Sequence, residues 1–153
     1  MIEAGQAAPD FTLPRDGEGD VTLSELQPKT VVLYFYPKDD TSGCTKQAIG
    51  FTEHLAAFEE AGAVILGVSK DSVKKHDKFR DKHELKIALL SDEESDVCET
   101  YGVWVEKSMY GKKYMGIERS TFVIAGDGTV KEAWRKVKVP GHVEKVLEAV
   151  KAL

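Results

Sequence analysis

The residue of this sequence best suited to covalent chemistry is Cys44. It follows a polar stretch at 39–43 and falls in the first turn of the helix that the sequence predicts from Thr41 onward. Unpaired backbone N–H groups and the positive end of the helix dipole favour thiolate over thiol at such a position. Most cysteines are small, inert core residues, but the polar approach to Cys44 argues against that interpretation. We therefore predict a reactive thiolate at Cys44.

Alternating strands and helices are predicted to position this cysteine. The apolar run at 31–36, rich in β-branched and aromatic residues, is typical of a strand buried on both faces of a sheet. Pro37 ends this strand, and apolar residues at helical spacing then continue from Thr41 to near Gly62. Further strands are predicted at 63–69 and around 87–90. Each precedes a helix, the first capped by Asp71 or Ser72 and the second spanning 93–101.

The two ends of the chain complete the expected fold. Residues 1–29 carry prolines and glycines between short apolar pieces, which indicates a hairpin or an extended lead-in. Asp127-Gly128 predicts a hairpin between strands at 120–124 and 129–134, and a final helix is predicted over 141–153. The segment around Gly111-Lys112-Lys113 is predicted to be an exposed loop. The pattern indicates an α/β fold whose central mixed sheet has helices on both faces.

Length and charge limit the possible partners. A chain of 153 residues is expected to form a single domain, 1–153. Its net charge of −5 provides no basic surface for nucleic acid or for an anionic membrane. The first residues lack the features of a signal peptide, and no apolar run reaches about 18 residues, the minimum for a spanning helix. We therefore expect a cytoplasmic protein with no nucleic-acid or membrane partner.

The segment around Cys44 resembles the peroxidatic signature of the peroxiredoxins, specifically the bacterioferritin comigratory protein or peroxiredoxin Q class. Tyr36-Pro37-Lys38-Asp39-Asp40-Thr41-Ser42-Gly43-Cys44-Thr45-Lys46 carries that signature. The similarity extends over nearly the whole chain through segments in the family's order, at 8–11, 68–71, 90–92, 101–104 and 119–124. Ser42 stands where the family commonly has proline. The resemblance implies a thioredoxin-like fold and the reduction of hydrogen peroxide and organic hydroperoxides without a cofactor.

The same resemblance implies four active-site residues, Pro37, Thr41, Cys44 and Arg119. Cys44 attacks the peroxide, which requires an ionised sulfur and hydrogen-bond donors for the developing oxyanion. Thr41 can direct its hydroxyl toward the sulfur or serve as the helix N-cap. Arg119 can stabilise the thiolate and hydrogen-bond the peroxide. Pro37 can shield the thiolate from water while ending the strand.

This sequence lacks the resolving cysteine that many members of the class use to return the reactive cysteine to thiolate. The two familiar positions for a resolving cysteine hold Ile49 and Arg80 here, so Cys98 is the only other thiol. Its neighbours Val97 and Tyr101 predict a buried, inert position, and a disulfide requires Cα atoms within about 7 Å. We therefore favour a one-cysteine cycle in a monomer, with an external reductant such as thioredoxin, glutaredoxin or glutathione. A two-cysteine cycle through Cys98 is the alternative.

Other functions are weaker hypotheses. The four histidines are dispersed, and no third ligand at usable spacing accompanies His76 and His83, so no metal site is expected. A cysteine hydrolase would need His54 or His142 beside Cys44. A thioredoxin-type disulfide reductase would need a CxxC motif, which is absent. A redox sensor or holdase is the remaining alternative, and it would be oxidised once rather than turn over.

Overall fold

A five-stranded mixed sheet forms the centre of the molecule. The computed structural model describes residues 2–153. Strand β3 is parallel to β4 and antiparallel to β8, while β4–β5 is parallel and β8–β9 antiparallel. In spatial order the strands are β5 (Ala88–Ser91), β4 (Ala63–Ser69), β3 (Thr30–Phe35), β8 (Ser120–Ile124) and β9 (Val130–Trp134). The predicted strands are thus confirmed, with small shifts at their ends, and so is the mixed character of the sheet.

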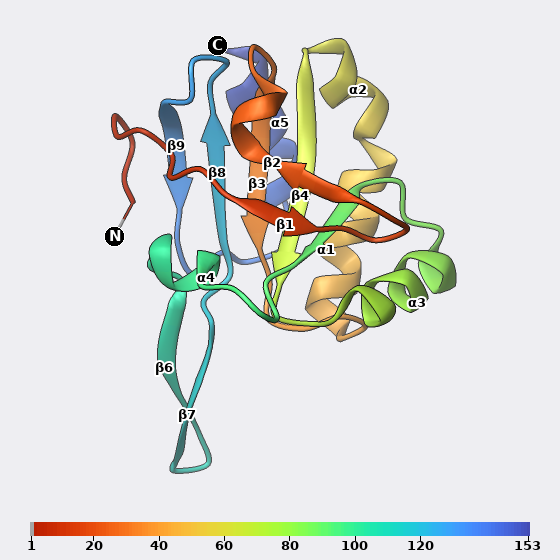
Figure 1. Cartoon of the computed structure of the whole chain (residues 1–153), viewed down its shortest axis with the longest axis vertical. Coiled ribbons are helices and arrows are strands. Elements are labelled where there is room, and N and C mark those ends of the chain that lie inside the picture. Colours follow the sequence, from red (N-terminus) through yellow and green to blue (C-terminus); the bar gives the residue numbers. More distant parts are fainter. Residues whose placement is uncertain (1) are drawn as a thin grey trace.

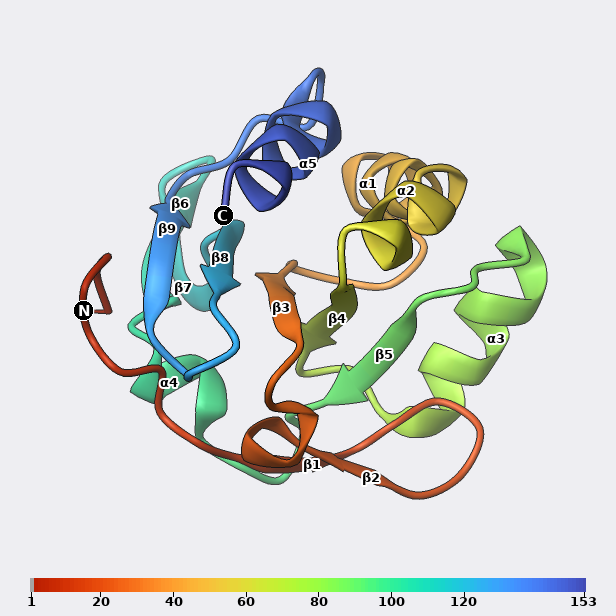
Figure 2. The same cartoon turned by 90° about the horizontal axis from the view of Figure 1, so that it is seen from above.

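Alternating side chains of β3 pack into two separate hydrophobic layers, one on each face of the sheet. Val32 and Tyr34 point into one layer, and Leu33 and Phe35 into the other, because successive strand side chains project to opposite faces. Figure 2 shows α1, α2 and α5 over one face, and hairpin β1–β2 with α4 over the other. The helices are η1 (Leu23–Leu26, 3₁₀), α1 (Ser42–Glu53), α2 (Leu55–Glu60), α3 (Val73–His83), α4 (Val97–Thr100) and α5 (His142–Lys151).

Two predicted helices differ from the observed ones. The helix expected from Thr41 to near Gly62 is interrupted at His54, whose ring Nδ1 lies 2.9 Å from the carbonyl oxygen of Gly50. The helix expected over 93–101 is only the short α4. The Asp92 carboxylate accepts hydrogen bonds from the backbone N–H groups of Val97 and Cys98, the first two residues of α4. The helix therefore begins at Val97 and not at residue 93.

Two hairpins lie outside the central sheet. The N-terminal hairpin is confirmed as β1 (Thr12–Pro14) and β2 (Asp20–Thr22). The exposed loop predicted around Gly111-Lys112-Lys113 is correct only for its exposure and for the turn at Gly111, because β6 (Trp104–Met109) and β7 (Lys112–Ile117) form a second hairpin, which projects from the body in Figure 1. Most side chains of β6 and β7 are partly or fully exposed, so the alternation of buried residues that marks a strand is absent.

Among residues 2–153, none of the helices combines the length and the apolar character that crossing a lipid bilayer requires.

Candidate active site

Cys44 lies in the first turn of α1, close to the end of the central strand β3. The chain leaves β3 at Phe35, passes through the loop at 36–41 and enters α1 at Ser42. Thr41 and Ser42 are exposed, whereas Cys44 itself is only 2% exposed and packs in the layer between the sheet and the helix. The sulfur is therefore placed at a helix N-terminus but is largely shielded from bulk water.

Arg119 reaches Cys44 because of the register between two antiparallel strands. Phe35 at the end of β3 pairs with Ser120 at the start of β8, so the preceding residue, Arg119, stands at the sheet edge where α1 begins. Its Nη2 donates to Cys44 Sγ at 3.3 Å, and its Nη1 donates to Gln47 Oε1 at 2.7 Å. One guanidinium thus holds both the sulfur and a second side chain of α1, with a permanent positive charge beside the thiol.

Glycine at position 43 leaves space for this contact. A Cβ atom on Gly43 would lie 3.2 Å from Arg119 Nη2, closer than ordinary van der Waals contact. A larger residue before Cys44 would therefore displace the guanidinium by a few tenths of an ångström. The contact between Arg119 and Cys44 therefore explains sterically why glycine precedes Cys44.

Gln47 is a site residue that the sequence interpretation missed. It follows Cys44 by three positions on α1, so both side chains lie on the same helix face. Gln47 is fully buried, and its Nε2 has no hydrogen-bond partner among the described residues. The i, i+3 spacing of a polar residue from the reactive cysteine was the available signal. Without Arg119 in place, however, that spacing is equally typical of an exposed helix face.

Thr41 and Pro37 frame the loop before the helix. Thr41 occupies the N-cap position of α1, but its hydroxyl makes no capping hydrogen bond and instead donates to the Lys38 carbonyl at 2.9 Å. Thr41 is thus the predicted N-cap residue by position, and its carbonyl accepts from Thr45 N at 2.8 Å, but its side chain does not cap the helix. Pro37 is partly buried and comes two residues after the end of β3. The hydroxyl of Thr41 is bound to the loop and not to the sulfur.

Besides Arg119 and Gln47, the surroundings of Cys44 include buried aromatic rings of the same hydrophobic layer and a second cation. Burial, followed by the charges of Cys44 and Asp39, raises the pKa of Tyr34 well above its ordinary value, so its phenol is neutral. Its ring stacks on Phe51 with centroids 4.7 Å apart. Burial and then the charge of Arg119 lower the pKa of Lys107 on β6, whereas Cys44 acts in the opposite sense. Hairpin β6–β7 therefore adds a lysine to the electrostatic environment of the site.

Cys98 lies on the other side of the central sheet from Cys44. It is fully buried in α4, within the second hydrophobic layer, and both cysteines are free thiols. Burial, followed by the charge of Asp92, raises the pKa of the Cys98 thiol far above its usual value. The sheet separates the two sulfurs, and Cys98 is held as a neutral thiol.

The remaining histidine candidates are engaged elsewhere. His54 contacts the Gly50 carbonyl, and His142 Nε2 lies 2.8 Å from Thr121 Oγ1, so neither hydrogen-bonds to Cys44. Across residues 2–153, histidine, cysteine and acidic side chains form no group of three that could hold a metal ion. The structure therefore supplies no base at the sulfur for a cysteine hydrolase.

Fold and site together define a class of protein. A mixed sheet with helices packed on it places a cysteine at a helix N-terminus beside an arginine, the arrangement of a thiol-based redox enzyme on a thioredoxin-like fold. The AhpC/TSA family model matches residues 4–133. The chain belongs to this family, and within it to the Bcp, or peroxiredoxin Q, peroxiredoxins.

Individual relatives agree over almost the full length. The peroxiredoxin Bcp of Bacillus subtilis is 50% identical over 98% of this chain and 96% of its own. A cysteine-to-serine mutant of Xylella fastidiosa PrxQ superimposes with a TM-score of 0.94 at 42% identity, covering 99% of this chain and 97% of its own. A structure of the Xanthomonas campestris bacterioferritin comigratory protein, described for its alkyl peroxide reduction activity, gives a TM-score of 0.88 at 47% identity, covering 93% and 90%.

Membership in this family makes the chain a thiol peroxidase, an oxidoreductase that consumes a peroxide and a reducing thiol. The thioredoxin-like fold implied by the sequence is confirmed by the same structures.

Proposed function

We propose that Cys44 is the peroxidatic nucleophile of this peroxidase. Its thiolate attacks one oxygen of the peroxide, the O–O bond breaks, and the electron pair leaves with the second oxygen as alkoxide or hydroxide. That oxygen takes up a proton to give alcohol or water, and Cys44 is oxidised to a sulfenic acid. The observation that carries this proposal is the 3.3 Å contact between Arg119 Nη2 and the buried Cys44 sulfur.

In this proposal the three other site residues serve the same displacement. The guanidinium of Arg119 favours the thiolate and donates to the peroxide oxygen as charge develops on it. The Thr41 hydroxyl turns from the Lys38 carbonyl to the incoming peroxide, a short movement for a side chain that is exposed. Pro37, which has no N–H to attract water, shields the sulfur side of the loop.

We further propose that an external thiol completes the cycle. A thiol of thioredoxin, glutaredoxin or glutathione attacks the sulfenic sulfur and expels water, and a second thiol then releases Cys44 from the mixed disulfide. The position of Cys98 beneath the opposite face of the sheet supports this one-cysteine cycle, because a disulfide requires Cα atoms within about 7 Å.

We extend the proposal to the substrate and to the assembly state. The Xanthomonas campestris relative is described for alkyl peroxide reduction, and we propose that this chain also accepts alkyl hydroperoxides in addition to hydrogen peroxide. We propose a monomer, since the site is assembled within one chain from α1, the preceding loop and Arg119.

Peroxide consumption by the wild type, Cys44→Ser and Cys98→Ser with each thiol donor tests the proposal. Loss of turnover only in Cys44→Ser is the expected result. Loss of thioredoxin-linked turnover in both variants, with a Cys44–Cys98 disulfide found by non-reducing mass spectrometry, would instead establish a two-cysteine cycle. A single equivalent of peroxide consumed in the presence of excess thiol would indicate a sensor.

A further inference from the structure

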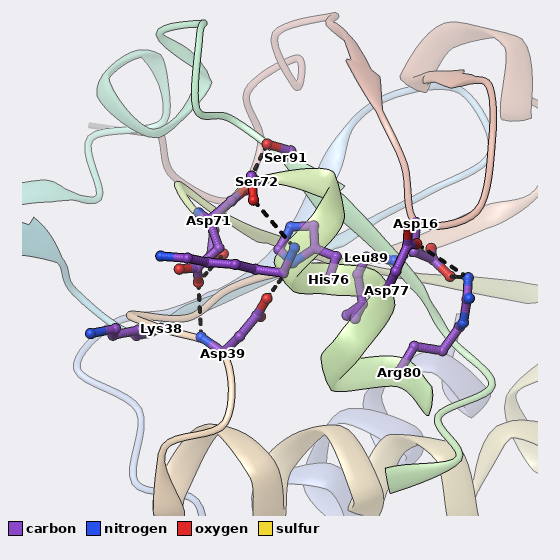
Figure 3. A network of polar contacts seen from close by, with 12 residues as sticks. Asp16, Lys38, Asp39, Asp71, Ser72, His76, Asp77, Arg80, Leu89 and Ser91 are labelled. Atoms are coloured by element: carbon purple, nitrogen blue, oxygen red, sulfur yellow. Dashed lines mark hydrogen bonds and ion pairs between the residues drawn. The ribbon is translucent and has the colours of Figure 1, made fainter. Parts of the chain in front are cut away.

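Asp39 ties the loop before the reactive helix to α3 and to the segment that precedes α3, and it also contacts Tyr36 within the loop. Its carboxylate accepts a hydrogen bond from Tyr36 Oη at 2.6 Å and lies 2.6 Å from His76 Nδ1 on α3. Its backbone N–H donates to Asp71 Oδ2 at 2.8 Å. Figure 3 shows Asp39, Asp71 and His76 converging beside α3, with the loop carrying Lys38 and Asp39 running past them. Thr41 follows two residues later and α1 begins at the next residue, Ser42.

Both ring nitrogens of His76 face hydrogen-bond acceptors. Nε2 lies 2.9 Å from the Leu90 carbonyl oxygen, which can only accept, so this nitrogen carries a proton. Nδ1 lies against the Asp39 carboxylate, whose other oxygen already accepts from Tyr36. The His76 side chain is completely buried and that of Asp39 is 6% exposed, so water cannot replace either partner. A doubly protonated ring satisfies every one of these contacts.

We infer that His76 is a positioning residue of the peroxidase, buried as an imidazolium that holds the loop at 36–41, and with it the start of α1, in place through Asp39. This inference rests on the proposed role of Cys44. His76 touches neither the sulfur nor the peroxide position. It acts by fixing Asp39, and through it the entry to α1 from which Thr41 and the helix N-terminus meet the substrate.

The charges around His76 favour its cationic form. Burial by itself lowers the pKa of His76, but the hydrogen bond and charge of Asp39, then the Leu90 carbonyl and the charge of Asp71, outweigh burial and raise it. The groups that face the ring are thus Asp39 and Tyr36 of the loop at 36–41, Asp71 before α3 and the Leu90 carbonyl of β5. None of these is a cation.

A second contact on the same loop provides a matched control. Asp40 has a left-handed φ of 58° and is bound by Lys82 Nζ at 2.7 Å and His83 Nε2 at 2.8 Å, both from α3. This contact is exposed to solvent, where ion pairs contribute little. Breaking the exposed His83 contact should therefore leave the loop in place, whereas breaking the buried His76 contact should release it.

The charge of His76 should make the oxidation of Cys44 depend on pH. The pKa of His76 is raised in the folded protein. The ion pair of His76 with Asp39 is therefore fully present below the ordinary histidine pKa near ~6.5, and it is lost as pH rises through the pKa of His76 in the folded state. Oxidation of Cys44 by peroxide should therefore decline on the alkaline side. Reduction of the oxidised Cys44 by a thiol, which does not need the assembled peroxide site, should not decline with it.

The experiment uses wild type, His76→Gln, Asp39→Asn, the double variant and the control His83→Gln. Glutamine at position 76 can still donate to the Leu90 carbonyl but cannot carry the charge. Stopped-flow measurement gives the rate of Cys44 oxidation by hydrogen peroxide, and a separate mixing experiment gives the rate of reduction by a thiol. ¹⁵N NMR of the wild-type imidazole reports directly whether both ring nitrogens are protonated at neutral pH.

We expect a cationic His76 ring at pH 7 and an alkaline decline in the oxidation rate of the wild type. His76→Gln and Asp39→Asn should each lose about tenfold in that rate at pH 7, within the cost of misplaced reacting groups, and lack the decline. The double variant should lose no more than either single one, as expected for two residues that act as a unit. His83→Gln should follow the wild type in both rate and pH profile.

A neutral His76 ring at pH 7 would overturn the inference, and this readout needs no variant to fold. Wild-type rates in a folded His76→Gln would also overturn it. The failure of the proposed function looks different, because wild type and Cys44→Ser would then consume peroxide equally slowly. The two outcomes are therefore distinguishable once Cys44→Ser is measured beside these five proteins.

Discussion

Arg119 Nη2 lies 3.3 Å from Cys44 Sγ although 75 residues separate the two in sequence. The same guanidinium contacts Gln47, so its position is fixed from two points of one helix. Arg119→Lys should lower the rate of Cys44 oxidation by about 10²-fold, in the range found when a charge-stabilising donor is removed, because lysine lacks the planar fork that places one nitrogen on Cys44 and another on Gln47. Stopped-flow oxidation by hydrogen peroxide measures this, with the partly exposed Arg15→Lys as control. An unchanged rate would exclude Arg119 from the chemistry.

Gly43→Ala should weaken the same contact by steric pressure. The added Cβ would lie 3.2 Å from Arg119 Nη2, so the guanidinium must shift away from the sulfur. We expect a loss of about tenfold in the oxidation rate, consistent with the sensitivity of catalysis to small misplacements. Ser42→Ala, one position earlier and exposed, is the matched control. Equal rates in both variants would mean that Arg119 adjusts without cost.

Cys98 should behave as a structural thiol. Cys98→Ala removes one buried sulfur and should cost about 1 kcal/mol or more of unfolding free energy while turnover with thioredoxin stays near the wild-type value. Because burial and Asp92 raise the pKa of Cys98, its alkylation by iodoacetamide should be negligible until the protein unfolds. Rapid alkylation of Cys98 in the native protein would contradict this prediction.

His142 should make the protein less stable in acid. Burial, followed by the positive charges of Lys145 and Arg119, lowers the pKa of His142 to about 4. Because an unfolded histidine titrates near ~6.5, the stabilisation is complete above that pH and is lost as pH falls toward 4, by about 2–3 kcal/mol in all. Urea unfolding from pH 4 to pH 7 measures the change. His142→Gln should flatten the profile, and the partly exposed His54→Gln should not.

The turn of hairpin β6–β7 offers a stabilising substitution. Tyr110 is 99% exposed and has a left-handed φ of 52°, followed by Gly111 at 79°, the conformation in which Asn-Gly is preferred. Tyr110→Asn should raise the unfolding free energy by roughly 0.5 kcal/mol, and Gly111→Ala should lower it. Urea unfolding of both variants checks the opposite signs. A destabilised Tyr110→Asn would show that the tyrosine makes contacts beyond the turn.

Local features of the sequence determined the central strand, the helix that follows it and the position of Cys44. The continuous apolar run at 31–36, rich in β-branched and aromatic residues, favours an inner strand, and Pro37 with the polar loop separates it from the helix that begins at Ser42. These features act between close neighbours along the chain. They predicted the alternating strands and helices for the same reason, and they failed at β6–β7, where exposure on both faces removes the pattern.

Only the tertiary structure decided which distant groups surround the sulfur. The pairing of Phe35 with Ser120 brings Arg119 to the site, and the sheet places Cys98 on the face opposite Cys44. The ion pair of His76 with Asp39 depends on how α3 packs beside the loop. Hydrogen bonds and burial between such segments depend on strand order and register, which no local pattern of residues encodes.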